Sequence, residues 1–137
     1  MNKKILTVLI AIFLINFSLS LYIQIKDSQS LPICGINIAS SCNQVTESSY
    51  STVLGIKNTT IGIVVFPLLA IFMLVYYKIR KKYLKSIGSL ILACSAIFAL
   101  RLIYIQFFVL REICKFCIII DTLTILSFLI FYYSKDR

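Results

Sequence analysis

Two pairs of cysteines are the residues in this chain whose type and spacing can do chemistry. Cys114 and Cys117 form a C-x-x-C motif where an apolar run, Ile118 to Tyr133, begins. If this run is a helix, its N-terminus presents unpaired N–H groups and the positive end of the helix dipole, and both favour a thiolate over a thiol. Lys115 and Arg111 add positive charge nearby. The motif therefore predicts a redox-active dithiol, with a structural disulfide or two apolar helix residues as the alternatives.

The position of this motif also predicts a direction for electron transfer. Residues three apart in a helix share a face, so Cys117 would lie about one turn deeper than Cys114. Cys114 would then face water while Cys117 faces lipid. Such a pair can carry electrons between a soluble dithiol and an acceptor dissolved in the membrane.

The second pair, Cys34 and Cys42, lies in the one long polar segment, residues 26–58, which is rich in Ser, Asn and Thr. A disulfide between them would close a small loop and constrain the chain by about 2–3 kcal/mol in the entropy model. A structural staple and a redox shuttle explain this pair equally well.

The composition indicates a membrane protein, because 60% of the residues are hydrophobic and only 14% are charged, with a mean hydropathy of +0.96. The length suits one domain, residues 1–137, with four membrane helices. We therefore predict an all-α four-helix membrane bundle whose single extracytoplasmic loop, residues 26–58, contains a short half-helix. The first apolar run fits either a signal peptide or a retained helix, and its length, which exceeds that of a usual signal-peptide apolar region, favours the retained helix. The predicted helices span residues 5–25, 59–77, 86–110 and 115–133.

The basic residues predict the orientation of the chain in the plasma membrane. The net charge of +9 is concentrated between the apolar runs, which argues against nucleic-acid binding, and the segment Lys78 to Lys85 holds five basic residues in eight. Placing this turn in the cytoplasm puts both termini there as well, with nine of the fourteen basic residues. Four crossings then put both cysteine pairs on the oxidising, extracytoplasmic face. Because this argument uses no cysteine, it supports a disulfide role independently.

Three further residues within the apolar runs need an explanation. Cys94 lies deep in the third run and is most simply a packing residue. Arg101 is a charge within the membrane, which costs at least about 2.5 kcal/mol unless the side chain faces a cavity or a partner. Asp121 is a candidate partner for Arg101, and it is also a candidate neutral acid, proton acceptor for quinol formation, or polar rim residue.

An ordered set of motifs resembles the vitamin K epoxide reductase family, in its microbial form that serves disulfide-bond formation. The loop pair Cys34 and Cys42 comes first, and residues 48–56, SSYSTVLGI, are similar to the family's Ser-x-Tyr/Trp…Gly stretch. Residues 58–62, NTTIG, resemble its Asn-Ser-x-x-Gly element, and Gln106 to Val109 leads into the C-x-x-C motif. Each piece is weak alone, and together they extend over most of the chain in the family's order.

The resemblance implies a function for each matching residue. Family members form a four-helix bundle that encloses a quinone, such as ubiquinone or menaquinone. Cys117 matches the sulfur beside the quinone and Cys114 the sulfur that exchanges with the loop. Cys42 matches the loop cysteine that exchanges with Cys114, and Cys34 the one that meets a secreted or membrane-anchored thioredoxin-like (DsbA-like) partner. Asn58 matches a hydrogen-bond donor to the quinone, and Ser48 a serine of the half-helix that caps the site.

One position departs from the family pattern. Animal members carry a tyrosine four residues after the second C-x-x-C cysteine, where it helps to hold the quinone or its epoxide. Here that residue is Asp121. The departure brings epoxide reduction into question and leaves quinone reduction unaffected, because a carboxyl group can donate or accept a proton near the ring.

Four other interpretations compete with this one. The DsbB membrane oxidase catalyses the same net reaction, but its C-x-x-C motif precedes its spaced pair, and here the order is reversed. A four-cysteine metal site is permitted by the spacing, but the chain has no His and an outer location does not favour it. The third is a non-enzymatic membrane protein with two inert disulfides, and a fourth candidate function is the epoxide reduction of the vitamin K cycle.

Overall fold

Four long helices dominate the computed structural model, which describes residues 2–29 and 39–134 without the side chains of residues 39–41 and 43. Each is long and apolar enough to cross a membrane. The predicted four-helix membrane bundle is thereby confirmed. The bounds of the helices are α1 (Lys3–Ser28), α3 (Asn58–Ile79), α4 (Lys82–Tyr104), which continues into the π-helix η2 (Ile105–Leu110), and α5 (Lys115–Tyr133).

Three of the four helices begin or end beyond the positions that hydropathy marks, whereas α5 has the predicted bounds. α1 includes Lys3 at its start and Lys26 in its last turn, so it extends beyond the apolar run at both ends. α3 passes through Pro67 without interruption, as membrane helices commonly do when neighbouring groups satisfy the freed carbonyl. α3 and η2 are each followed by a residue in the left-handed conformation, Arg80 with φ 50° and Arg111 with φ 52°.

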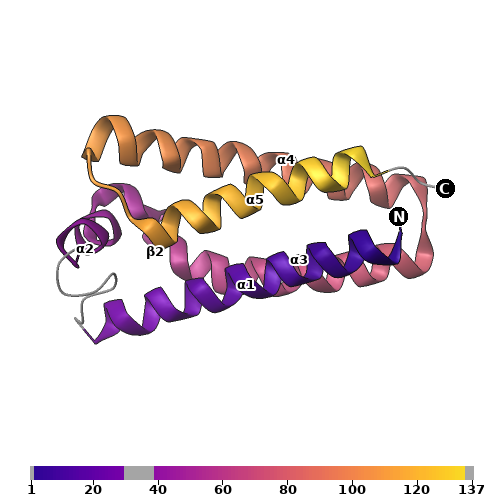
Figure 1. Cartoon of the computed structure of the whole chain (residues 1–137), viewed down its shortest axis with the longest axis horizontal. Helices are drawn as coiled ribbons and strands as arrows, with labels where there is room; N and C mark the ends of the chain where they lie inside the picture. The colour runs from indigo at the N-terminus through magenta and orange to yellow at the C-terminus, as the bar shows by residue number, and fades with distance from the viewer. Residues whose placement is uncertain (1, 30–38, 135–137) are drawn as a thin grey trace.

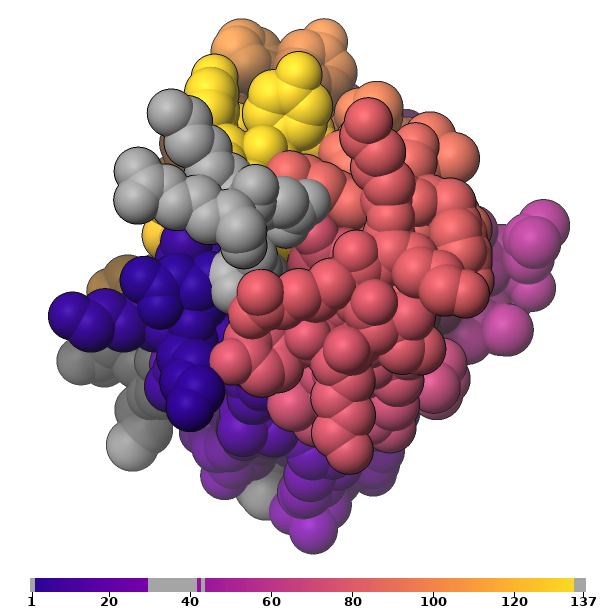
Figure 2. All heavy atoms as spheres, turned by 90° about the vertical axis from the view of Figure 1, so that its right-hand side faces the viewer, coloured from indigo at the N-terminus to yellow at the C-terminus, as the bar shows by residue number. Residues whose placement is uncertain are grey.

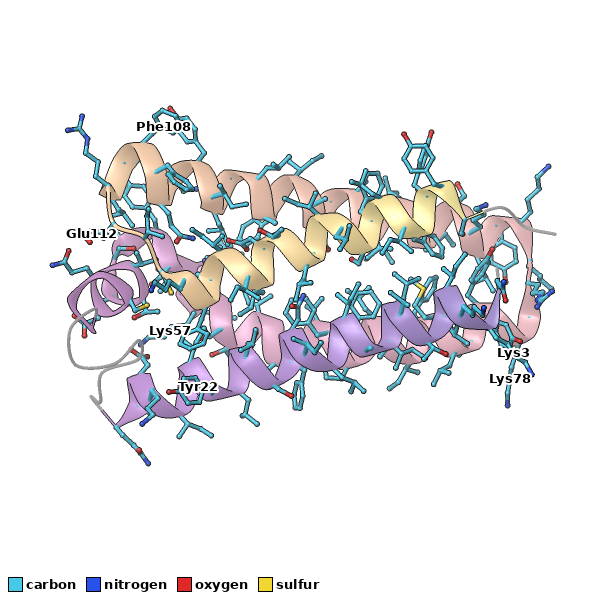
Figure 3. All side chains as sticks on the ribbon, in the orientation of Figure 1. Lys3, Tyr22, Lys57, Lys78, Phe108 and Glu112 are labelled. Atoms are coloured by element: carbon cyan, nitrogen blue, oxygen red, sulfur yellow. The ribbon has the colours of Figure 1, made fainter. Side chains whose placement is uncertain are left out.

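The four helices form a bundle in which α1 packs against α3 and α5, and α4 packs against α5, whereas α3 and α4 touch little. Figure 1 shows the start of α1, the α3–α4 turn and the end of α5 at one end of the bundle, and α2 at the opposite end. Figure 2 views the first end, where the α3–α4 turn covers much of the face beside the start of α1. In Figure 3, Lys3 and Lys78 lie at this end, while Lys57 and Glu112 lie at the other.

A compact cap covers the end of the bundle that carries the C-x-x-C motif. It consists of α2 (Ala39–Glu47), the 3-10 helix η1 (Ser49–Ser51), and the antiparallel strands β1 (Thr52–Val53) and β2 (Ile56–Lys57). Leu54 and Gly55 join the strands with φ of 53° and 82°, the two positive values that a tight two-residue hairpin turn requires. The predicted half-helix is α2. The hairpin was not predicted, because its strands have only two residues each.

Polar contacts attach the cap to the helices beneath it. Lys57, the last residue of β2, forms an ion pair with Asp27 in the final turn of α1. The Thr59 hydroxyl, in the first turn of α3, donates to Oε1 of Gln24 on α1. These contacts tie the C-terminal end of α1 to the N-terminal end of α3, directly below the hairpin.

The main apolar core lies in the half of the bundle that carries the termini. Its centre contains aromatic rings from three helices, including the edge-to-face pair Tyr76 and Phe131, whose ring centroids are 5.5 Å apart. Gly88 of α4 lies against this core, and a Cβ atom added there would be 2.7 Å from Cε1 of Phe72 and 3.2 Å from Cζ of Phe131. The buried members of the cluster are Leu6, Leu9, Phe13, Phe66, Leu69, Met73, Tyr76, Leu92 and Phe131.

Gly88→Leu is therefore expected to destabilise the bundle by about 1–3 kcal/mol, the usual cost of overpacking a filled core. Leucine has a higher helix propensity than glycine, so any loss of stability would come from packing and not from the helix itself. Thermal unfolding in detergent would measure the change. Ser86→Leu, at an exposed position on the same helix, is the matched control. Equal stability of the two variants would contradict this account of the core.

Candidate functional site

A cavity of about 380 Å³ lies beneath the cap, between residues of all four long helices. Its walls are mainly apolar, with side chains such as Ile23, Phe66 and Phe98. Its polar lining comes from both the cap and the helices. Four residues predicted from the sequence as site residues contribute to it: Ser48, Asn58, Cys117 and Asp121.

Cys114 is the N-cap residue of α5. Its sulfur accepts a hydrogen bond from the backbone N–H of Cys117 at 3.4 Å. Its own backbone N–H donates to Oε1 of Gln106 at 3.1 Å. The motif therefore stands at the helix N-terminus, as the sequence predicts.

The expectation that Cys114 faces water is wrong. Its side chain has an exposed fraction of 0%, because the cap closes over it. It belongs to a buried cluster with Ile23, Cys42 and Val45. Cys117 is half-buried and lines the cavity.

The environment of Cys114 favours its thiolate. The thiol of Cys117 donates a hydrogen bond to the Cys114 sulfur and lowers its pKa below the usual value for a cysteine. Burial acts in the opposite direction, and backbone N–H groups of Cys117 and Phe116 lower the pKa further. Cys114 therefore ionises more readily than an ordinary cysteine, which makes it the nucleophilic member of the pair.

Cys42 differs in oxidation state from Cys114 and Cys117. Cys42 is disulfide-bonded, whereas Cys114 and Cys117 carry free thiols. Cys42 and Cys114 are both fully buried and pack in the same cluster. Cys34, the other predicted loop cysteine, lies outside the described residues. One buried cluster therefore contains an oxidised cysteine of the cap, Cys42, and a reduced cysteine at the start of α5, Cys114.

Asn58 and Asp121 each present a buried oxygen atom without a hydrogen-bond partner, namely Oδ1 of Asn58 and Oδ2 of Asp121. Asn58 is the first residue of α3, and its Nδ2 donates to the backbone carbonyl of Tyr50 at 3.4 Å. Asp121 has an exposed fraction of 6% and lies one turn beyond Cys117 on α5. Ser48 lies just after α2 and not within the half-helix, and its hydroxyl donates to the carbonyl of Val45 at 2.8 Å.

These residues fit a quinone ring. The ring is flat and apolar with an oxygen at each end, and the cavity combines apolar walls with a few polar groups that lack partners. An amide can present either its oxygen or its nitrogen after a half-turn, so Asn58 can serve a quinol hydroxyl or a quinone carbonyl. The carboxyl group of Asp121 has the same versatility when it carries a proton.

Several residues at the site were not identified from the sequence. Gln106 lies in η2, and π-helical segments commonly occur at functional sites. Asn16 on α1 does not line the cavity, but it is fully buried and donates to Thr124 of α5, which does. Cys94, which we interpreted as a packing residue, lines the cavity. The one available signal is polar spacing within apolar runs, such as Asn16 and Ser20 four residues apart.

Arg101 does not pair with Asp121, which the sequence offered as its candidate partner, in the described part of the chain. Its side chain is exposed on α4, and among the described residues no ion pair joins it to Asp121. Arg101 also does not line the cavity. Asp121 is therefore buried without a cationic partner in the described part of the chain.

Replacing Gln106 should show how much the buried N–H of Cys114 depends on its acceptor. Gln106→Leu leaves this N–H unpaired and is expected to lower the free energy of unfolding by about 1–3 kcal/mol. Thermal unfolding of the reduced protein in detergent is the measurement. Gln44→Leu, at an exposed position of α2, is the matched control. A Gln106→Leu protein as stable as this control would mean that the N–H finds another acceptor.

Comparison with known proteins identifies the family. The chain matches the family model described as the vitamin K epoxide reductase family over residues 4–132, from the first turn of α1 to the last turn of α5. No curated protein and no solved structure matches the chain. The family match includes the cap and both cysteine pairs, and the cavity has the character that a quinone requires. This chain is therefore a membrane oxidoreductase that belongs to the vitamin K epoxide reductase family.

Proposed function

We propose that this protein is a quinone-dependent thiol–disulfide oxidoreductase that supports disulfide-bond formation. Two electrons pass from a reduced thioredoxin-like partner to Cys34 and Cys42, then to Cys114 and Cys117, and finally to a quinone. The observation that carries the proposal is the packing of disulfide-bonded Cys42 with Cys114, while Cys117 lines the cavity. The cap, the helix N-terminus and the cavity thus follow one another in the order that such an electron transfer requires.

The transfer within the protein consists of thiol–disulfide exchanges. A partner thiolate attacks the Cys34–Cys42 disulfide at Cys34 and releases Cys42. The second thiolate of the partner then breaks the bond between the partner and Cys34, which releases Cys34 and leaves the partner oxidised. The Cys42 thiolate then attacks Cys114 in the oxidised C-x-x-C pair and releases Cys117. Attack of Cys34 on Cys42 re-forms the cap disulfide and releases Cys114. The state with Cys42 oxidised and with Cys114 and Cys117 reduced is the product of these exchanges.

Oxidation of the C-x-x-C pair completes the cycle. A quinone bound in the cavity would be the oxidant, because it accepts two electrons and two protons to become a quinol. Asn58 and Asp121 would hold its oxygen atoms, and Ser48 would close the cavity from the cap side. The reaction direction follows the potentials, because about 30 mV in favour of the quinone corresponds to about 1.4 kcal/mol for a two-electron couple.

The charge distribution supports an orientation with both termini in the cytoplasm and the cap outside the plasma membrane. Lys3 and Lys78 lie at the end of the bundle opposite the cap (Figure 3), and the positive-inside rule places that end in the cytoplasm. Both cysteine pairs then face the compartment where disulfides persist and where a thioredoxin-like partner oxidises its clients.

The experiment that tests the proposal is an anaerobic assay with the full-length protein in detergent. Reduced thioredoxin-like protein is supplied as the electron donor, short-chain ubiquinone or menaquinone as the acceptor, and the quinone absorbance is followed. We expect one quinone to be consumed for each partner disulfide formed. If neither quinone is consumed and the disulfide of Cys42 stays intact throughout, the proposal is wrong.

A further inference from the structure

When Cys114 reacts as a thiolate, the reduced C-x-x-C pair holds one proton fewer than the reduction of a quinone needs. Cys114 caps α5, accepts hydrogen bonds from the N–H and the thiol of Cys117, and has a lowered pKa. The pair in the form that this geometry favours is a Cys114 thiolate with a Cys117 thiol, which together hold one proton. Formation of a quinol consumes two protons. The second proton must come from another group in the cavity or directly from water.

Asp121 is placed to hold that proton. It lies four residues after Cys117, on the same face of α5, and both side chains line the cavity. It is buried to an exposed fraction of 6%, and its Oδ2 has no hydrogen-bond partner. A carboxylate buried without a cation would be strongly unfavourable, and a thiolate at Cys114 would add repulsion. The neutral acid avoids both costs.

The turn of α5 that carries Asp121 is fixed by a contact from α1. Nδ2 of Asn16 donates to Oγ1 of Thr124 at 3.2 Å and to the carbonyl of Ile120 at 3.4 Å. Asn16 is fully buried, and its Oδ1 also lacks a donor. Unpaired acceptors therefore lie beside this turn. Among the described residues, the one cation that lines the cavity is Lys57, which is paired with Asp27. Both facts again favour a carboxyl group that keeps its proton.

We propose that Asp121 is the acid that supplies the second proton when the C-x-x-C pair is oxidised, an inference that rests on the proposed function. The Cys114 thiolate and the Cys117 thiol lose two electrons as the S–S bond forms. The S–H bond of Cys117 and the O–H bond of Asp121 break, and their protons go to the two quinone oxygens. The resulting Asp121 carboxylate regains a proton from water entering on the cap side. Atoms, electrons and charge balance in each step.

Other titratable groups share the cavity and must be distinguished from Asp121 in any pH experiment. Asp121 differs from them because it is an acid without an ion-pair partner on the face of α5 that carries Cys117. Asp27 is paired with Lys57, and Cys94 lies on α4. The groups that line the cavity with Asp121 are Asp27 of α1, Tyr50 of η1, Lys57 of β2, Cys94 of α4 and Cys117 of α5.

The first test needs no quinone. Infrared spectra of the reduced, quinone-free protein at neutral pH, taken as the difference between ordinary and heavy water, should show a protonated carboxyl band that shifts between the two solvents. Asp121→Asn should remove this band, whereas Glu47→Gln, which removes an exposed acid of α2, should leave it. The absence of an Asp121-dependent band in the wild type would overturn the proposal, because Asp121 would then be a carboxylate with no proton to give.

The second test is a single turnover of the pre-reduced protein with short-chain quinone. Asp121→Asn is expected to lower the rate about 10²–10⁴-fold, the usual contribution of a positioned acid. Its rate should also fall tenfold for each unit of pH increase, because the proton now comes from hydronium ions in the solvent, while the wild-type rate stays flat near neutral pH. Asp121→Glu should restore a flat profile. A slow Asp121→Asn protein with a flat profile would show a role in binding only, and a rate within twofold of the wild type would show none.

The exchange half-reaction separates this inference from the proposed function and from misfolding. Reduced partner should convert the disulfides of Asp121→Asn to thiols at the wild-type rate, because the cap and the C-x-x-C pair are unchanged. A variant that fails in this exchange is misfolded, and Asp121→Glu then decides the question through its pH profile. If the wild type exchanges with the partner but never reduces a quinone, the proposed function fails, and this inference fails with it.

Discussion

Cys117→Ala should abolish quinone reduction with every electron donor, protein or small molecule. Cys117 is the one C-x-x-C sulfur that lines the cavity, while Cys114 is buried beneath the cap. Without it, the pair can neither form a disulfide nor release two electrons. Quinone absorbance in the anaerobic assay measures the loss, which should exceed the roughly 10²–10⁴-fold effect expected of an acid that only assists.

The same variant provides its own control. Cys42 keeps its disulfide, so the reduced partner should still reduce the cap pair of Cys117→Ala at a normal rate. This exchange shows that the protein is folded and that the partner binds. Continued quinone reduction by Cys117→Ala at more than a trace rate would mean that electrons leave the protein from another sulfur, and the assignment of the relay would be wrong.

Cys117→Ala should also change the ionisation of Cys114. The Cys117 thiol is the largest cause of the lowered pKa of Cys114, so its removal should raise that pKa toward the ordinary value for a cysteine. At a fixed neutral pH, less of Cys114 would then be thiolate. Thiolate absorbance measured as a function of pH, with the double variant Cys114→Ala/Cys117→Ala as the baseline, should show the transition at higher pH than in the wild type.

Cys42→Ala is expected to separate the two kinds of electron donor. Cys42 is the cap cysteine that packs with Cys114, so its loss removes the step between the partner and the C-x-x-C pair. Turnover with the reduced thioredoxin-like partner should fall to background. Dithiothreitol should still drive quinone reduction, because it is small enough to reduce the C-x-x-C pair directly.

The comparison of donors makes this prediction specific. A general defect in folding would affect turnover with both donors, whereas a broken relay affects only the protein partner. Equal turnover of wild type and Cys42→Ala with the partner would show that the cap pair is bypassed. Loss of turnover with both donors would instead assign Cys42 a structural role at the helix N-terminus.

The sequence by itself determined the membrane bundle and the place of the C-x-x-C motif in it. Long apolar runs bounded by charged residues specify four helices, because water and lipid impose a strong distinction along the chain. The helix N-terminus at the C-x-x-C motif follows from the position of the last apolar run. The order of the motifs was sufficient to identify the family, which the family match then confirmed.

The tertiary structure decided which residues meet. A membrane helix is apolar on nearly every side, and lipid is as apolar as the protein interior, so the sequence gives little indication of which face packs inward. For this reason the burial of Cys114, the cavity position of Cys94 and the outward position of Arg101 were not predictable. The contacts of Asn16 with Thr124 and of Gln106 with Cys114 likewise depend on how the helices turn toward one another. The spacing in the sequence puts Asp121 one turn beyond Cys117, but the burial of Asp121 and the lack of a hydrogen-bond partner for its Oδ2 depend on how the helices pack.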